Sequence, residues 1–256
     1  MAHGVRGSTA ITTNCKGAGM RPGAIQGAVE DFWFKRNDQR EKLDDKGKSG
    51  GTARANKHMG GFEGLVKQVF VDCGLDESCV LTGKPYLPGF YRVRKQWDLV
   101  VLYDGILVAA LEFKSQVGSV SRNINNRFEE ALGTATDTAA AQNRNGAFGD
   151  VPPWLGYVLV LREDEETEQP DRDVSALFET DPVFKGHSYN QRYQEMIRRL
   201  IGEKVYDAGW FLTTTSTADG VAYKEPLDTA TGATLRVAIE GRVNFVKAVV
   251  EARRSK

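Results

Sequence analysis

The fold of this chain is decided by residues 97–115, which read Trp-Asp-Leu-Val-Val-Leu-Tyr-Asp-Gly-Ile-Leu-Val-Ala-Ala-Leu-Glu-Phe-Lys-Ser. Two apolar runs flank the Asp104-Gly105 pair, and Asp-Gly between such runs is the strongest short-range signal for a β-hairpin. The sequence therefore predicts two long antiparallel strands joined by a tight turn.

The same hairpin carries the residues that indicate chemistry. Glu112 and Lys114 are two residues apart on one strand, so their side chains project from one face while Phe113 packs behind. With a two-residue turn, Asp98 lies opposite Leu111 and diagonal to Glu112. A turn longer by one residue would place Asp98 directly opposite Glu112. In either register two carboxylates and one ammonium converge at the end of the hairpin.

These charges lie in apolar surroundings, because Leu-Val-Val-Leu follows Asp98 and Leu-Val-Ala-Ala-Leu precedes Glu112. Partly buried carboxylates cost several kcal/mol each unless they are compensated. Mg²⁺ suits such an oxygen-only cluster, and it would support phosphodiester hydrolysis with Lys114 holding the attacking water. The alternative is a simple salt bridge in which Lys114 pairs with Glu112 or Asp98.

Outward from the hairpin, helical and strand patterns alternate. Helices, hairpin, helix, strand, helix, strand and helix in this order predict one α/β domain, with a mixed central sheet flanked by helices. The predicted helices are the segment from Pro22 through Lys42, which turns polar after Trp33, and the segments 62–70 ended by Gly74, 125–142, 189–206 and 235–253. The other predicted strands are 154–162 and 209–217. Residues 163–173 are expected to form an acidic, solvated loop.

The 256 residues are 41% hydrophobic, enough to bury the core of one large domain. We expect residues 1–21 to be a flexible leader and residues 22–256 to be a single domain with a basic, glycine-rich loop at 46–60. No run of 18 apolar residues occurs, so no membrane span is available. Cys15, Cys73 and Cys79 form no Cys-x-x-Cys pair, which favours a reducing, cytoplasmic compartment without structural zinc.

The formal net charge is zero, but the charge is distributed unevenly. Residues 1–60 carry 11 Lys/Arg against 6 Asp/Glu, and residues 161–190 carry 3 against 9. This asymmetry permits a basic face for a polyanion such as DNA, although random scatter on a soluble surface gives the same counts. Within the basic loop, four side chains are expected to contact DNA phosphates, unless the loop is only a solvated linker: Lys46, Lys48, Arg54 and Lys57.

Other chemistries are excluded by their missing residues. The three histidines, His3, His58 and His187, form neither a His-x-Lys motif nor a His-metal nuclease site. Gly47-Lys48-Ser49 imitates the end of a P-loop, but Lys42 stands where the first glycine must be. We expect the histidines to be surface or core residues, and we expect no use of ATP.

Several motifs in one order resemble the XhoI family of type II restriction endonucleases, within the PD-(D/E)xK nuclease superfamily. They are Trp97-Asp-Leu-Val-Val, Ala109-Ala-Leu-Glu-Phe-Lys-Ser-Gln-Val-Gly118, Asn123-x-Asn-Asn-Arg-x-Glu-Glu-Ala131 and Pro153-Trp-Leu-Gly-Tyr157. The resemblance spans roughly residues 26–251. It implies a restriction-endonuclease-like core and a homodimer that cuts a DNA palindrome, 5′-CTCGAG-3′, leaving four-base 5′ overhangs. A cognate DNA methyltransferase is expected in the same system.

Carried over to this chain, the resemblance implies that Asp98 and Glu112 hold Mg²⁺ and that Lys114 positions the water. Gln116 lies on the same strand face and is expected to support the site. Glu63, in the helix before the hairpin, matches the place of an additional carboxylate in related nucleases. An exposed helix charge is the alternative for Glu63.

Sequence specificity is expected to reside partly in Asn123, Asn125, Asn126 and Arg127, which follow the catalytic strand. Asn can bind adenine and Arg can bind guanine in bidentate fashion. Alternatively, Asn125 or Asn126 caps the following helix. For the whole chain, the competing functions are a structure-specific repair or recombination nuclease and a DNA-binding module that has lost catalysis.

Overall fold

A six-stranded mixed sheet forms the centre of the computed structural model, which describes residues 20–46, 57–170 and 176–255. The strand order is β1-β4-β5-β6-β7-β8, and β6 runs parallel to both β5 and β7, while the other neighbours are antiparallel. A separate two-stranded sheet consists of β2 and β3. The strands are β1 Val80–Leu81, β2 Tyr86–Pro88, β3 Arg94–Gln96, β4 Leu99–Tyr103, β5 Ile106–Gln116, β6 Leu155–Arg162, β7 Ala208–Thr217 and β8 Gly220–Lys224.

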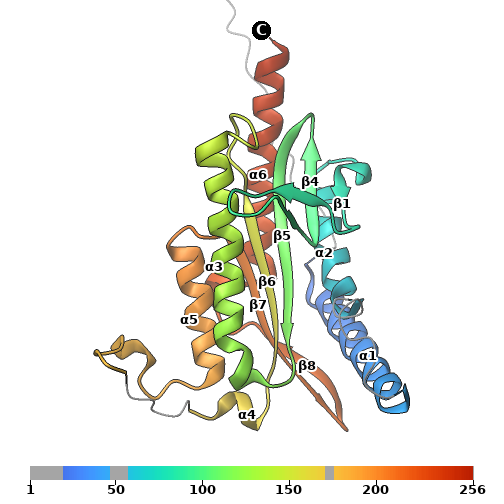
Figure 1. Cartoon of the computed structure of the whole chain (residues 1–256). Helices are drawn as coiled ribbons and strands as arrows, with labels where there is room; N and C mark the ends of the chain where they lie inside the picture. Colours follow the sequence, from blue (N-terminus) through green and yellow to red (C-terminus); the bar gives the residue numbers. More distant parts are fainter. Residues whose placement is uncertain (1–19, 47–56, 171–175, 256) are drawn as a thin grey trace, which may run out of the picture.

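Helices cover both faces of the central sheet (Figure 1). One apolar cluster joins one face of the sheet to α1, α2 and α6, and a second joins the other face to α3 and α5. The helices are α1 Pro22–Lys46, α2 Gly60–Asp72, α3 Val120–Asn145, α4 Glu165–Glu168, α5 Tyr189–Gly202 and α6 Gly232–Arg254, with 3-10 turns η1 Lys57–Met59, η2 Glu77–Cys79, η3 Pro182–Phe184 and η4 Asp228–Ala230. This arrangement confirms the predicted α/β fold with a mixed sheet and a long central hairpin.

The register of the β4–β5 hairpin contains an irregularity that positions the site. The turn itself has two residues, Asp104 and Gly105, both with positive φ, and Tyr103 pairs with Ile106. The register then shifts between Val101 and Leu102, so that Leu99 pairs with Leu111. A β-bulge, and not a longer turn, therefore brings Asp98 opposite Glu112.

The bulge also sets which face of β5 carries the charged residues. Val108 and Ala109 are consecutive, yet both join the cluster on the α1, α2 and α6 face. Beyond them Ala110 faces α3 and α5 while Leu111 and Phe113 face the opposite core. Glu112 and Lys114 therefore project toward α3, as the alternation along a strand requires.

Three predicted segments need correction. Helix α3 begins at Val120, five residues before the predicted start at 125, with Ser119 at the N-cap in the left-handed region. Before Phe128 the start of α3 has two apolar residues, Val120 and Ile124, among polar ones, so the helical pattern in the sequence is weak at this end. Asn125 and Asn126 consequently lie inside the helix and do not cap it.

The second correction concerns the acidic segment 163–173. Within it, Asp164 and Thr167 form a capping box that starts the one-turn helix α4, because the side chain of each accepts a hydrogen bond from the backbone N–H of the other. Residues 171–173 lie outside the described residues. The segment predicted as an acidic loop therefore contains one short helix, because a capping box stabilises its first turn.

The third correction concerns the loop predicted at 46–60, whose two ends are helical. Lys46 is the last residue of α1, Lys57–Met59 form η1, and Gly60 starts α2. His58 and Met59 are buried, and their burial holds this end of the segment on the core. Residues 47–56 lie outside the described residues.

The start of the chain differs slightly from the predicted leader. Met20 is buried and belongs to the core cluster, although residues 1–19 lie outside what the structure describes. None of the helices in the described ranges combines the length and apolar character needed to cross a membrane.

Candidate active site

Glu112 is the centre of a charged cluster on β5. It is only 5% exposed, and each of its carboxylate oxygens meets an ammonium. Lys114 Nζ lies 2.7 Å from Oε1, and Lys95 Nζ lies 2.8 Å from Oε2. Lys114 also lies 3.9 Å from Glu130 on α3. Two ammoniums on one buried carboxylate offset the cost of removing its charge from water.

Asp98 stands next to this cluster, at the start of β4. It is 8% exposed, and its Oδ2 accepts a hydrogen bond of 2.8 Å from the backbone N–H of Phe113 on β5. This bond spans the hairpin to the residue between Glu112 and Lys114, so Asp98 lies beside the part of β5 that carries them.

Glu63 lies on α2, close enough to Asp98 to sense its charge, and is half-buried, so it is not an exposed helix charge. Burial and, to a smaller extent, the negative charge of Asp98 together raise the pKa of Glu63 to about 7, against the opposing effect of Lys84 and Lys35. The two carboxylates are thus close enough for mutual repulsion.

A hollow of about 210 Å³ opens over Glu112. It lies between β5, the β2–β3 sheet and α3, and we call it the carboxylate hollow. Its walls carry three cationic and three anionic side chains, and Gly133 and Thr134 of α3 complete it. The charged residues that line it are Arg92, Lys95, Lys114, Glu112, Glu129 and Glu130.

Gln116 and Arg127 form a support beside the cluster. Gln116 is buried, donates to the carbonyl of Gly118 and accepts from Arg127 Nε at 3.2 Å. Arg127 also donates to the carbonyl of Ser115 at 3.2 Å and forms an ion pair of 2.7 Å with Glu130. Gln116 therefore shares the strand face of Glu112, as expected, but its side chain holds α3 to β5.

The four residues expected to read DNA bases occupy the first turns of α3 and point in different directions. Asn123 donates to the carbonyl of Ser119 at 3.0 Å, whereas Asn125 accepts from Arg192 of α5 at 3.3 Å. Asn125 and Asn126 are exposed, and Arg127 turns inward to β5. The structure does not gather these residues into one cluster.

The basic loop can be placed only in part. Lys57 is exposed at the start of η1. Lys48 and Arg54 lie outside the described residues, as does the side chain of Lys46.

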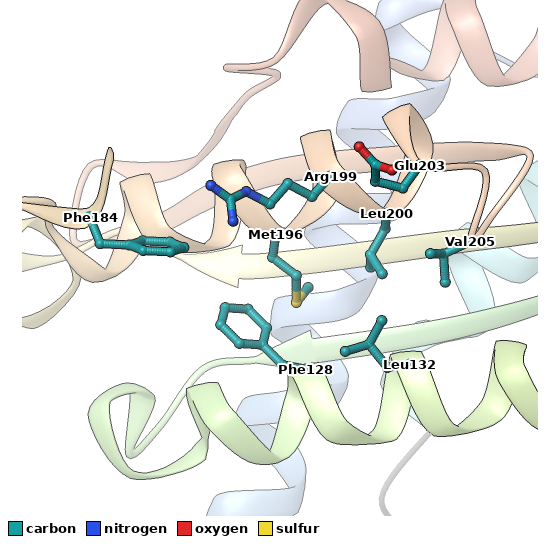
Figure 2. Close-up of a pocket in the computed structure, with 8 residues that line it drawn as sticks. All are labelled: Phe128, Leu132, Phe184, Met196, Arg199, Leu200, Glu203 and Val205. Carbon is teal, nitrogen blue, oxygen red and sulfur yellow. The ribbon is translucent and has the colours of Figure 1, made fainter. Parts of the chain in front are cut away.

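A second hollow, of about 250 Å³, lies between α3 and α5 (Figure 2). Phe128 and Leu132 line it from α3, and Met196 and Leu200 line it from α5, with Phe184 at one end. Its described walls are mainly apolar and contain a single carboxylate, that of Glu203, so they offer no paired oxygen ligands. Of these two hollows, the carboxylate hollow is the one whose described walls group several carboxylates.

Sequence reasoning missed Lys95 and Arg92, which line the carboxylate hollow from the short β2–β3 sheet. Both precede the hairpin in a segment with Pro85, Pro88 and Gly89, which gives no strand signal. The absence of any Asp or Glu between Glu77 and Asp98 was the one sequence signal of a basic surface.

The residues of the site fit a divalent cation that has few protein ligands. Within residues 20–46, 57–170 and 176–255, no group of three or more His, Cys, Asp or Glu side chains could hold a metal ion. Mg²⁺ needs only one or two carboxylates when substrate phosphates and water complete its coordination. Asp98 and Glu112, which are both buried, would be the carboxylates to hold such an ion.

Comparison with known proteins agrees with this geometry. Residues 36–223 match the family model described as "Restriction endonuclease XhoI". The chain is 38% identical over 180 residues to "Type II restriction enzyme XhoI" of Xanthomonas vasicola, covering 68% of this chain and 72% of that protein. It is 35% identical over 185 residues to "Type II restriction enzyme BstVI" of Geobacillus stearothermophilus, covering 69% and 82% of the two chains.

A third relative is "Type II restriction enzyme AbrI" of Azospirillum brasilense, at 40% identity over 167 residues, covering 62% of this chain and 75% of that protein. No solved structure matches the chain. The matched region contains the whole hairpin and the carboxylate hollow. The chain therefore belongs to the XhoI family of type II restriction endonucleases.

Proposed function

We propose that the protein hydrolyses phosphodiester bonds of double-stranded DNA at a short palindrome and that its metal ion is Mg²⁺. Type II restriction enzymes in general act on double-stranded DNA and use divalent metal ions. The observation that supports the proposal here is the presence of two buried carboxylates, Asp98 and Glu112, on the hairpin. Glu112 and its ion-pair partner Lys114 line a hollow between a basic sheet and α3.

In this mechanism Asp98 and Glu112 hold the metal ion. A divalent cation bound there supplies Lewis-acid stabilisation of the charge that develops on the phosphoryl group and favours deprotonation of water. Gln116 is proposed to support the strand that bears these ligands, through its bonds to Arg127 and Gly118. Glu63 is proposed as an additional carboxylate that acts through Asp98.

Lys114 is proposed to hold the attacking water and to stabilise the phosphoryl oxygens. Its Nζ is fixed between Glu112 and Glu130, at 2.7 and 3.9 Å, so the ammonium is oriented before substrate arrives. Fixed charge of this kind stabilises a transition state without the cost of reorganising it. The same contacts would occur in a purely structural salt bridge, so the distinction depends on kinetics.

We propose 5′-CTCGAG-3′ as the recognition site, cut after the first base to leave four-base 5′ overhangs. The family resemblance supports this choice. A palindrome has two-fold symmetry, which favours a homodimer that presents each site twice. A cognate methyltransferase would protect the same sequence in the host cytoplasm.

Base contacts are proposed for Asn123, Asn125, Asn126 and Arg127. Asn125 and Asn126 are exposed as they stand. Arg127 would have to release Glu130, because its Nη1 is held by that carboxylate. Contacts to DNA phosphates are proposed for four basic residues: Lys46, Lys48, Arg54 and Lys57. Replacing these residues should weaken binding to all DNA sequences.

A supercoiled plasmid with one CTCGAG site tests the proposal directly. Incubated with Mg²⁺, the protein should convert it to one linear band and leave intact a plasmid in which each half-site has one altered base pair. Sequencing of the ends should show four-base 5′ overhangs. Relaxation of both plasmids without discrete bands would identify a structure-specific nuclease, and no change in either would identify a DNA-binding module without catalysis.

A further inference from the structure

The β2–β3 sheet is fixed to α3 through one buried carboxylate, Asp137. This side chain is 2% exposed, and its Oδ1 accepts hydrogen bonds from the backbone N–H groups of Phe90 and Tyr91 at 2.9 and 2.7 Å. Its Oδ2 accepts from Arg92 Nε at 2.6 Å. Burial alone would raise the pKa of Asp137, but the bonds from Arg92, Tyr91 and Phe90 outweigh it and hold the pKa below its ordinary value.

The contact between this loop and Asp137 is close as well as polar. A Cβ atom added at Gly89 would meet Asp137 Oδ2 and would lie 2.7 Å from the carbonyl oxygen of Arg92. Arg92 reaches further along α3 and donates to the carbonyl of Gly133 at 3.3 Å. The loop between β2 and β3 is thus clamped in one position, and Figure 1 shows this teal sheet crossing in front of β5 to α3.

The clamped segment is basic and exposed. Residues 82–97 contain Lys84, Arg92, Arg94 and Lys95 and no Asp or Glu. Arg94 is exposed and stacks on the ring of Tyr86, with its guanidinium carbon 4.3 Å from the ring centroid. The loop between the strands also exposes three large apolar side chains, those of Phe90, Tyr91 and Val93.

The segment also forms a wall of the site. Arg92 and Lys95 line the carboxylate hollow, and Lys95 contacts Glu112 directly at 2.8 Å. The β2–β3 sheet therefore lies next to any DNA strand whose phosphate enters the hollow. Exposed cations at that position would meet the neighbouring phosphates of the same strand.

We propose that the β2–β3 sheet is a DNA-backbone clamp, in which Arg92 and Arg94 contact phosphates that flank the scissile one, and that Asp137 is its positioning residue. The inference rests on the proposed DNA cleavage and extends it to a surface outside the hairpin. Asp137 touches no reacting atom. It acts by fixing the loop that carries Arg92 and leads into β3.

Salt dependence of binding tests the clamp without any cleavage. Each phosphate neutralised by a protein cation contributes about −0.9 to the slope of log K against log salt concentration. With a short random-sequence duplex in EDTA, Arg92→Gln and Arg94→Gln should each reduce the slope by about one. Lys185→Gln removes an exposed cation near η3 and should leave the slope unchanged.

The positioning role of Asp137 is tested by substitutions that weaken its contact with the β2–β3 loop, either at Asp137 or at Gly89. Asp137→Asn keeps acceptors for Phe90 and Tyr91 but loses the charge that holds Arg92, and Gly89→Ala forces the loop away. Both should raise KM for cognate plasmid about tenfold or more, and more than they lower kcat. Asp137→Ala should have the largest effect, and a thermal melt of each variant establishes that it is folded.

The outcomes separate the clamp from the proposed cleavage. Unchanged slopes for Arg92→Gln and Arg94→Gln in a protein that cuts its plasmid would overturn the clamp and leave the cleavage standing. An equal reduction of the slope for Lys185→Gln would also overturn the clamp, because any surface cation would then contribute equally to DNA binding. Folded Asp137 and Gly89 variants with wild-type KM would remove the positioning role. A wild-type protein that neither binds the duplex nor cuts the plasmid would refute both proposals.

Discussion

At the residue scale, Glu112 binds two ammoniums while nearly inaccessible to solvent. If it holds Mg²⁺ with Asp98, then Glu112→Gln or Asp98→Asn should reduce plasmid cleavage below about one percent of wild type, because the loss of one ligand removes the metal-dependent stabilisation of the transition state. Binding to DNA in Ca²⁺ should persist or strengthen, since either substitution removes one negative charge that faces the phosphates. Glu129→Gln, at the rim of the carboxylate hollow, is the matched control and should retain cleavage. Normal cleavage by Glu112→Gln would refute the ligand assignment.

Lys114 and Lys95 provide an internal comparison, because both bind Glu112 at nearly equal distances of 2.7 and 2.8 Å. A structural salt bridge would make the two replacements equivalent. A catalytic Lys114 predicts that Lys114→Ala lowers kcat by about 10²-fold or more, the scale of losing one electrostatic or acid–base group. Lys95→Ala should act mainly on KM. Single-turnover cleavage at saturating enzyme measures the difference, and equal losses of kcat would favour the salt bridge.

At the element scale, η1 is attached to the catalytic strand by His58. This side chain is 2% exposed, and its Nε2 lies 2.7 Å from the Ser115 hydroxyl on β5. Burial and, to a smaller extent, the positive charges of Arg36 and Lys35 together lower the pKa of His58 to about 4. The histidine is therefore neutral in the folded protein at pH values where the unfolded chain is protonated.

The sign of the pH dependence follows from this difference. The unfolded chain takes up a proton near pH 6.5 and the folded protein only near pH 4, so the stability falls as the pH falls between these values. The wild type should lose about 1–2 kcal/mol more than His58→Gln between about pH 7.5 and about pH 5. Urea unfolding at the two pH values measures it. His187→Gln, half-exposed beside η3, should follow the wild type, and parallel curves for His58→Gln would contradict the assignment.

Helix α3 carries the proposed base contacts, and Arg127 also joins it to β5. Arg127→Ala should cost about 1–3 kcal/mol of discrimination for each base that the guanidinium reads, with weaker binding to the cognate duplex and little change for random DNA. Competition binding in Ca²⁺ measures both affinities. Gln116→Ala removes one hydrogen bond of Arg127 but keeps the guanidinium, and it serves as the control. Equal losses of affinity for cognate and random DNA would make Arg127 a phosphate-binding residue.

Elements with strong local signals were predictable, and those held by distant contacts were not. The hairpin was predictable because Asp104-Gly105 and two apolar runs indicate it locally. Strand β8 alternates between exposed and half-buried residues, and β2 and β3 have three residues each, so none of the three gives an apolar run. The first turns of α3 are polar, and their helical conformation depends on packing of Val120 and Ile124 against the sheet.

The site residues also divide into those that the sequence could predict and those that depend on distant contacts. Asp98, Glu112 and Lys114 are close in the hairpin, so a period of two was enough to group them. Lys95 and Asp137 enter through tertiary contacts, and the partner bonds of Asp137 span 45 to 47 residues. Spacing alone cannot reveal such contacts. The bulge was also not encoded in a recognisable motif, although it selects between the two registers considered for Asp98.

At the scale of the whole molecule, metal binding should stabilise the fold, because the unfolded chain lacks the site. A ligand at about 100 times its Kd contributes about 2.7 kcal/mol, and each kcal/mol raises the Tm of a protein of this size by about 2–4 °C. Ca²⁺ at about pH 8 should therefore raise the Tm of the wild type by several degrees above NaCl at equal ionic strength. Glu112→Gln and Asp98→Asn should lose most of that shift. An unchanged shift in both would place the cation elsewhere.

The bulge at Val108 and Ala109 also constrains how such a hairpin can evolve. A strand that left the turn with regular alternation would carry Glu112 and Lys114 into the core beneath α2 and α6, and would turn Leu111 and Phe113 toward α3. The hairpin can exchange many of its apolar side chains for others of similar volume. It cannot gain or lose one residue between the turn and Glu112, because every following side chain of β5 would then point to the opposite face of the sheet. For this site, the insertion or deletion of one residue in β5 is more damaging than most substitutions of its apolar residues.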